Sequence, residues 1–122
     1  MARASLARVR RTADGAVVCE RCEVPKSAFG RMRGLLGRSG LEPGDGMLID
    51  SAPSVHMFFM RFPIDVVFLD REWRVVGVRH RLRPWRVAGA RRAVAALELP
   101  AGAAAAAEIE EGDVLALDDS EG

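Results

Sequence analysis

The chain has 122 residues, of which 49% are hydrophobic and 29% are charged. This length suits one domain with one core, and the composition is that of a folded globular protein, which argues against extensive disorder. The formal net charge is only +1, so no strong overall field attracts nucleic acid or an anionic membrane. We expect a single domain over residues 1–122, with its core over about residues 15–118, a basic N-terminal strand or arm and an acidic C-terminal tail.

No stretch of the sequence approaches the ~20 apolar residues that a transmembrane helix needs. The N-terminus is basic, but it lacks the apolar segment that follows the charged part of a signal peptide. We therefore expect a cytoplasmic protein without a membrane or nucleic-acid partner, acting as a monomer or weak dimer.

A β-hairpin is predicted at the start of the chain. A strand containing Leu6 and Val9 can pair with residues 16–24 across Asp14 and Gly15. An Asp-Gly pair between two such runs is a strong hairpin signal, because both residues tolerate the positive φ that a tight turn needs.

A short helix is predicted over residues 28–36, after Pro25 ends the preceding strand. Ser27 is a suitable N-cap, and apolar side chains recur in this segment at helical spacing. Glycine and proline then form a loop that ends in a strand at residues 47–49, and residues 50–54 have the composition of a turn.

The middle of the chain is densely apolar. Pro63 divides the apolar stretch over residues 55–69, which predicts two short buried strands or one kinked strand. A turn at residues 70–72 then leads into a second hairpin arm, residues 73–82. Strand alternation predicts an inner and an arginine-rich outer face for this arm. The inner set is Val76, Val78, His80 and Leu82, and the outer set is Val75, Gly77, Arg79, Arg81 and Arg83.

The C-terminal part of the chain adds short elements. We expect a loop at residues 85–90, a strand at 93–99, one or two helical turns at 103–108 and a last strand at 114–117. The fold class is therefore α+β and strand-rich: a small open barrel or rolled, mostly antiparallel sheet with one short helix packed on it.

Cys19 and Cys22 form a Cys-x-x-Cys motif, a spacing found in redox pairs and in half of a zinc site. The motif lies within a predicted strand, so its two side chains should face opposite sides. This favours structural thiols over a redox pair or a metal site. No metal or cofactor is predicted, because the sequence lacks a phosphate-binding loop and the usual hydrolase and metalloprotease motifs.

Asp65 lies in the apolar segment 64–69, where both faces of the strand should be buried. A buried carboxylate is costly unless a cation or several hydrogen bonds stabilise it. Arg61 and His56 can reach Asp65 if the chain turns at Pro63. In one interpretation the three side chains converge on a polar ligand; in the other, Asp65 ties down a loop or pairs with Arg61 inside the fold.

Glu98 is a second single carboxylate in an apolar strand. If it faces the same interior as Asp65, the two form a carboxylate pair of the kind that hydrolytic sites use. Leu97 and Leu99 share the face opposite Glu98, however, which favours an outward and solvated Glu98.

Several segments together carry a family resemblance: residues 31–38 (RMRGLLGR), 46–49 (GMLI), 56–70 (HMFFMRFPIDVVFLD), 97–102 (LELPAG) and 112–113 (GD). Over about residues 15–118 the chain resembles the bacterial and archaeal domain of unknown function 192 family. This resemblance implies a compact β-rich domain that often stands alone and has no agreed activity, substrate or cofactor. Many members are exported, and many carry Trp-Met-Lys-Asn-Thr where this chain has residues 59–63 (FMRFP).

The leading functional hypothesis is a binding or accessory module with a cleft for a small polar or anionic ligand. Arg61 would supply the fork for an anion, Asp65 would orient Arg61 or His56, and Met60 would form a wall. The predicted ligand-binding residues are His56, Met60, Arg61, Asp65, Arg86 and Glu98. Two alternatives remain open: a hydrolase that uses His56 with a carboxylate, and a protein-interaction domain that uses the arginine-rich strand face.

Overall fold

The structure is a computed structural model that describes residues 5–25, 40–50, 54–57 and 60–119. The helix predicted over residues 28–36 lies outside this part of the chain. The described elements are β1 (Ser5–Arg11), β2 (Val17–Val24), β3 (Asp45–Asp50), β4 (Ser54–His56), β5 (Ile64–Leu69), β6 (Val75–Leu82), β7 (Val87–Gly89), β8 (Ala95–Pro100), α2 (Ala103–Ala106) and β9 (Leu115–Asp119).

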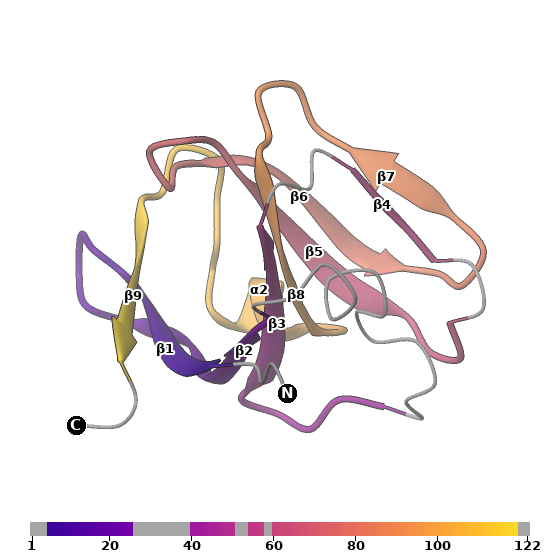
Figure 1. Cartoon of the computed structure of the whole chain (residues 1–122), viewed down its shortest axis with the longest axis horizontal. Helices are drawn as coiled ribbons and strands as arrows, with labels where there is room; N and C mark the ends of the chain where they lie inside the picture. Colours follow the sequence, from indigo (N-terminus) through magenta and orange to yellow (C-terminus); the bar gives the residue numbers. More distant parts are fainter. Residues whose placement is uncertain (1–4, 26–39, 51–53, 58–59, 120–122) are drawn as a thin grey trace.

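Seven of these strands form one curled sheet in the order β6-β5-β8-β3-β2-β1-β9, while β4 and β7 pair separately (Figure 1). Every pairing is antiparallel except that of β2 with β3. The two edge strands of the large sheet meet at one end, where the Val75 amide donates to the Asp113 carbonyl at 2.7 Å and Arg74 bridges to Val114. The predicted rolled, mostly antiparallel sheet with a short helix is confirmed.

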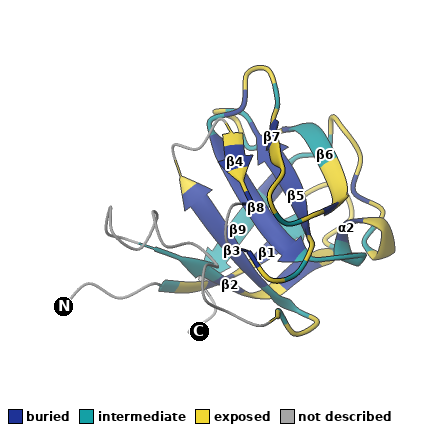
Figure 2. Cartoon of the chain, turned by 90° about the vertical axis from the view of Figure 1, so that its right-hand side faces the viewer, coloured by how far each residue is buried: buried dark blue, intermediate teal, exposed yellow. Residues whose placement is uncertain are grey.

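The curled sheet has an apolar cluster on each face, and strand β5 is buried on both (Figure 2). The first core fills the inside of the curl and includes Val67, Leu97 and Leu99. The second core lies on the other face, where the β4–β7 ribbon covers the sheet. Its members include Met47, Val55, Met57, Met60, Val66, Phe68 and Ala88. Strand β5 is therefore buried on both faces: the curl of the large sheet encloses one face, and the β4–β7 ribbon packs over the other.

The predicted N-terminal hairpin is confirmed, with β1 and β2 joined at Gly15, whose φ is 76°. Its register contains a β-bulge. Ala7 and Val9 are two positions apart on β1, whereas their partners Cys22 and Cys19 are three positions apart on β2. The extra residue in β2 turns both cysteine side chains to the same inner face. The prediction that they face opposite sides is therefore wrong.

A second bulge corrects the predicted faces of β6. Val75 and Val78 pack against the first core, whereas Val76 and Leu82 belong with the second. Ile64 and Val66 on β5 are two positions apart, but their β6 partners Leu82 and Arg79 are three apart. Phe68 and Leu69 are adjacent on β5, but their partners Gly77 and Val75 are two apart, which is a further irregularity. The inserted residues break strict alternation, so neither the inner nor the outer set predicted for this arm shares one face.

The segment at residues 85–90 also differs from its prediction. It was expected to be a loop, but residues 87–89 form β7, which pairs with β4 in antiparallel register. Val87 is 59% exposed, while its neighbour Ala88 packs into the second core. A strand this short gives little periodic signal in a sequence, and its pairing with β4 is what makes it a strand.

Candidate functional site

Asp65 is fully buried, and its carboxylate accepts three backbone hydrogen bonds. The Arg81 amide donates to Oδ1 at 2.8 Å, and the amides of Gly102 and Ala104 donate to Oδ2 at 3.0 and 2.9 Å. Arg81 lies in the β6 bulge with a φ of 53°, and Gly102 precedes α2 with a φ of 94°. One side chain thus satisfies the amides that the bulge and the start of the helix leave without strand partners.

These contacts match the second interpretation of Asp65, in which the carboxylate ties down loops. The hydrogen bonds of Asp65 do not include the predicted ones from His56 and Arg61. All three donors are backbone amides. His56 and Arg61 are exposed, and both lie outside the rolled sheet.

Glu98 is buried, with only 9% of its surface exposed, and it faces the second core. Its strand neighbours in register are Met47 on β3 and Val66 on β5, both members of that cluster. Leu97 and Leu99 point into the first core, as the alternation of β8 predicted. The expected solvent exposure of Glu98 is wrong, because its register partners on both sides belong to the buried second core.

The predicted carboxylate pair is also wrong. Asp65 lies opposite Leu99 in the β5–β8 register, so Asp65 faces the first core together with Leu99. Glu98 is the preceding residue on β8 and points to the other face. The two carboxyl groups are therefore separated by the sheet itself.

Burial raises the pKa of Glu98 to about 7, and desolvation is the cause. Among the described residues this carboxyl makes no hydrogen bond or ion pair. Every fully buried side-chain oxygen or nitrogen in that same part of the chain has a hydrogen-bond partner, so the oxygens of Glu98 keep some contact with solvent. Glu98 is thus a desolvated acid at the edge of an apolar cluster, close to half-protonated at neutral pH.

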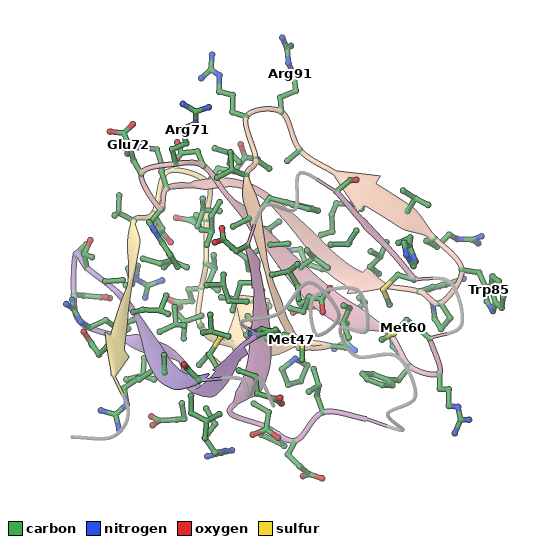
Figure 3. The ribbon with its side chains drawn as sticks, in the orientation of Figure 1. Met47, Met60, Arg71, Glu72, Trp85 and Arg91 are labelled. Carbon is green, nitrogen blue, oxygen red and sulfur yellow. The ribbon has the colours of Figure 1, made fainter. Side chains whose placement is uncertain are left out.

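The other predicted ligand residues lie together around one end of the β4–β7 ribbon. The Met57 amide donates to the Arg86 carbonyl, and the Trp85 amide donates to the Met57 carbonyl, both at 2.7 Å. These bonds place His56 beside Arg86, with Met60 buried in the second core and Arg61 exposed. Figure 3 shows Trp85 projecting at the outer end of this region and Met60 turned inward.

The described ion pairs lie at the opposite side of the molecule. They join Arg8 to Glu20, Arg10 to Asp118, Arg11 to Asp14 and Asp113, and Arg21 to Asp45. No arginine between residues 61 and 92 forms an ion pair within the described chain, although residues 79–92 contain six arginines and no acid. The end that carries Arg61 and Arg86 is therefore the more basic one.

Sequence reasoning identified Glu98 but missed its neighbours. Met47 and Val66 flank it only because β3 and β5 pair with β8, and register between distant strands leaves no local sequence signal. Trp85 was also missed. It is 56% exposed with a φ of 69°, and its place after Pro84 and before Arg86 was the available hint of a surface turn.

The chain matches the model of one protein family over most of its length. The model of the domain of unknown function 192, described as "Uncharacterized ACR", matches residues 9–117. The chain belongs to the domain of unknown function 192 family. No curated protein matches it.

Two solved structures share the fold of this domain of unknown function 192 protein. A protein of unknown function from Novosphingobium aromaticivorans DSM 12444 is 24% identical, with a TM-score of 0.77; the match covers 93% of this chain and 84% of the other. A proposed transcription regulator from Sinorhizobium meliloti 1021 is 25% identical, with a TM-score of 0.82; that match covers 94% and 95%.

The described residues contain neither a membrane-spanning helix nor a cluster of metal ligands. None of their helices has the length and apolar character needed to cross a membrane. Nor do they contain three or more His, Cys, Asp or Glu side chains grouped as metal ligands.

Proposed function

We propose that this domain of unknown function 192 protein is a binding module for a small polar molecule, which contacts Glu98. The observation that supports this function is a carboxyl group placed in an apolar cluster without a protein partner in the described chain. Such a group destabilises the fold when it ionises, and buried acids with shifted pKa values cluster at functional sites. A ligand that hydrogen-bonds to the carboxyl would offset the desolvation.

The chemistry of Glu98 determines which part of the ligand it binds. An ionised carboxylate accepts hydrogen bonds, so the matching group is an amine, amide or other N–H donor. Met47 and Val66 on either side would contact an apolar portion of the same molecule. The ligand expected from this face is therefore polar and donor-bearing.

An anionic group on the ligand would find its partner on the same face of the sheet. Val66 lies opposite both Glu98 and Arg79, so these three residues form a row across β8, β5 and β6. Strand spacing places the Cα atoms of Glu98 and Arg79 about 10 Å apart. Arg79 is exposed, and Arg61 and Arg86 add positive charge at the neighbouring ribbon. A small zwitterionic molecule, with an amine for Glu98 and an acid for an arginine, fits this arrangement.

Binding is a better proposal than hydrolysis for these residues. A hydrolase would need His56 within hydrogen-bond reach of a carboxylate that positions it. Asp65 uses both carboxylate oxygens for backbone amides, and Glu98 forms no hydrogen bond in the described chain.

A thermal-shift screen with free amino acids and small amines tests this function. At pH 8, a compound that occupies the site at a hundred times its Kd should stabilise the protein by about 2.7 kcal/mol, which corresponds to about 10 °C in Tm at this size. Glu98→Gln should abolish that rise. The matched control Glu110→Gln changes an exposed carboxyl in the turn before β9 and should keep it. A screen without any stabilising compound, or equal shifts in both variants, would contradict the proposal.

A further inference from the structure

Cys19 and Cys22 lie on the face of the sheet opposite Glu98, within the first core. They are the two cysteines of the chain, and both are buried and unbridged. The bulge in β2 places them opposite Val9 and Ala7, which are two residues apart on β1. Two residues of strand span about 6.6 Å, so the two cysteine Cα atoms are separated by a similar distance. That separation lies at the upper end of the range that a disulfide bridges.

The surroundings hold the Cys19 sulfur in one place. Its thiol donates to the Gly44 carbonyl at 3.4 Å. A Cβ atom on Gly46 would lie 2.8 Å from the same sulfur, so Gly46 leaves the space that the sulfur fills. Gly46 is also the register partner of Cys22 across the parallel β2–β3 pair. Both thiols are therefore packed over the same backbone position.

The two thiols are also electronically distinct. A hydrogen bond from the Cys22 side chain lowers the pKa of the Cys19 thiol, and the same bond, together with burial, raises the pKa of Cys22. This asymmetry makes Cys19 the thiol that ionises first and Cys22 the one that keeps its proton. It matches the division between an attacking and a resolving cysteine.

We propose that Cys19 and Cys22 form a reversible dithiol–disulfide pair, oxidised by a peroxide and reduced by an external dithiol. A metal site fits these residues less well, because no third His, Cys, Asp or Glu of the described chain joins the two thiols as a ligand. The pair lies on the other side of the sheet from Glu98, so it stands apart from the proposed ligand site.

The oxidation uses hydrogen peroxide as the two-electron acceptor. The Cys19 thiolate attacks one peroxide oxygen, the O–O bond breaks, and the departing hydroxide takes up the thiol proton as water. Cys19 is then a sulfenic acid. The Cys22 sulfur attacks the Cys19 sulfur, the S–O bond breaks, and the hydroxide leaves as a second water with the Cys22 proton. An external dithiol reverses the reaction by exchange and is itself oxidised to a disulfide.

A surface cavity offers an approach to the pair. It has a volume of about 510 Å³, and its lining includes Val18, Glu20 and Gly44. Val18 and Glu20 flank Cys19 in the chain, and the Gly44 carbonyl accepts the hydrogen bond from the Cys19 thiol. The cavity is therefore lined by residues that adjoin Cys19.

The sequence provides a clean chemical test, because Arg21 lies between the two cysteines. The folded, fully reduced protein is treated with one equivalent of hydrogen peroxide, unfolded in the presence of iodoacetamide and digested with trypsin. Cleavage after Arg21 separates the cysteines, so a disulfide keeps peptides 12–21 and 22–26 linked until a reductant is added. We expect the linked pair, a mass loss of two hydrogens, and at least a tenfold fall in alkylated thiol that dithiothreitol reverses.

Single variants assign the two roles. Cys22→Ala should stop at a sulfenic acid on Cys19, which a dimedone probe labels, whereas Cys19→Ala should give at least tenfold less label. Alanine is used because a buried, unreacted cysteine packs as a small apolar residue. The wild-type peptide map decides the proposal even if a variant fails to fold. Both cysteines still alkylated after peroxide treatment, sulfinic acids in place of the disulfide, or disulfides between two chains would overturn it.

Discussion

Replacing Asp65 by alanine is expected to lower the free energy of unfolding by roughly 3–5 kcal/mol. The substitution removes the acceptor of three backbone hydrogen bonds, and bonds to a charged group each contribute about 1.5–3 kcal/mol. It leaves the amides of Arg81, Gly102 and Ala104 without that partner in the interior. The bulge in β6 and the first turn of α2 lose their shared anchor at the same time, so the cost is that of a broken network.

Urea unfolding followed by tryptophan fluorescence measures this loss, with Asp118→Ala as the matched control. Asp118 forms a 2.7 Å ion pair with Arg10, but both side chains are about 40% exposed, and such surface pairs contribute about 0–1 kcal/mol. Asp65→Asn retains one acceptor oxygen and should fall between the two variants. If Asp65→Ala were as mild as Asp118→Ala, the anchoring role would be wrong and Asp65 would return to the candidate ligand-binding residues.

Replacing Glu98 by glutamine is expected to stabilise the protein above neutral pH and to flatten its pH dependence. Burial raises the folded-state pKa of Glu98 from 4.5 to about 7. Between these values the native state holds the proton and the unfolded state releases it, so stability falls as pH rises. The full difference is about 3 kcal/mol at 1.36 kcal/mol per pH unit. It is absent below pH 4.5 and complete above about pH 7.

The measurement is a series of urea unfolding curves from pH 4.5 to pH 8 for the wild type, Glu98→Gln and Glu110→Gln. At the acidic end, Glu98 is protonated and resembles glutamine, so the three proteins should be close in stability. At pH 8, Glu98→Gln should be the most stable by up to about 3 kcal/mol. Parallel curves for all three proteins would mean that Glu98 titrates normally, and the proposed ligand site would lose its main support.

The two proposed sites can be tested separately because the sheet lies between them. Glu98 lies beside Met47 and Val66 of the second core, whereas Cys19 and Cys22 belong to the first core inside the curl. A failed ligand screen would leave the peptide map of the thiols unaffected, and an unreactive dithiol would leave the behaviour of Glu98 unchanged.

The local elements of this protein follow from the sequence. Asp14 and Gly15 specify the first hairpin, because they favour the tight turn that β1 and β2 share. The apolar residues on both sides of Asp65 in β5 predict a strand buried on both faces, and the structure confirms it. The burial of Asp65 was predicted from the same run, together with the need for several hydrogen-bond donors. The family was also recognisable, since its motifs are contiguous in the chain.

The tertiary structure determines which face of the sheet Cys19, Cys22 and Glu98 occupy. The bulge that brings Cys19 beside Cys22 exists because β2 has one more residue than β1 in this part of their pairing. Glu98 is buried because β3 and β5, which pair with β8 on its two sides, place it between Met47 and Val66 of the second core. A one-residue change of register reverses the face of every following side chain. Register and cover are set by strands far apart in the sequence, so local pattern could place these residues on strands but could not say what each one faces.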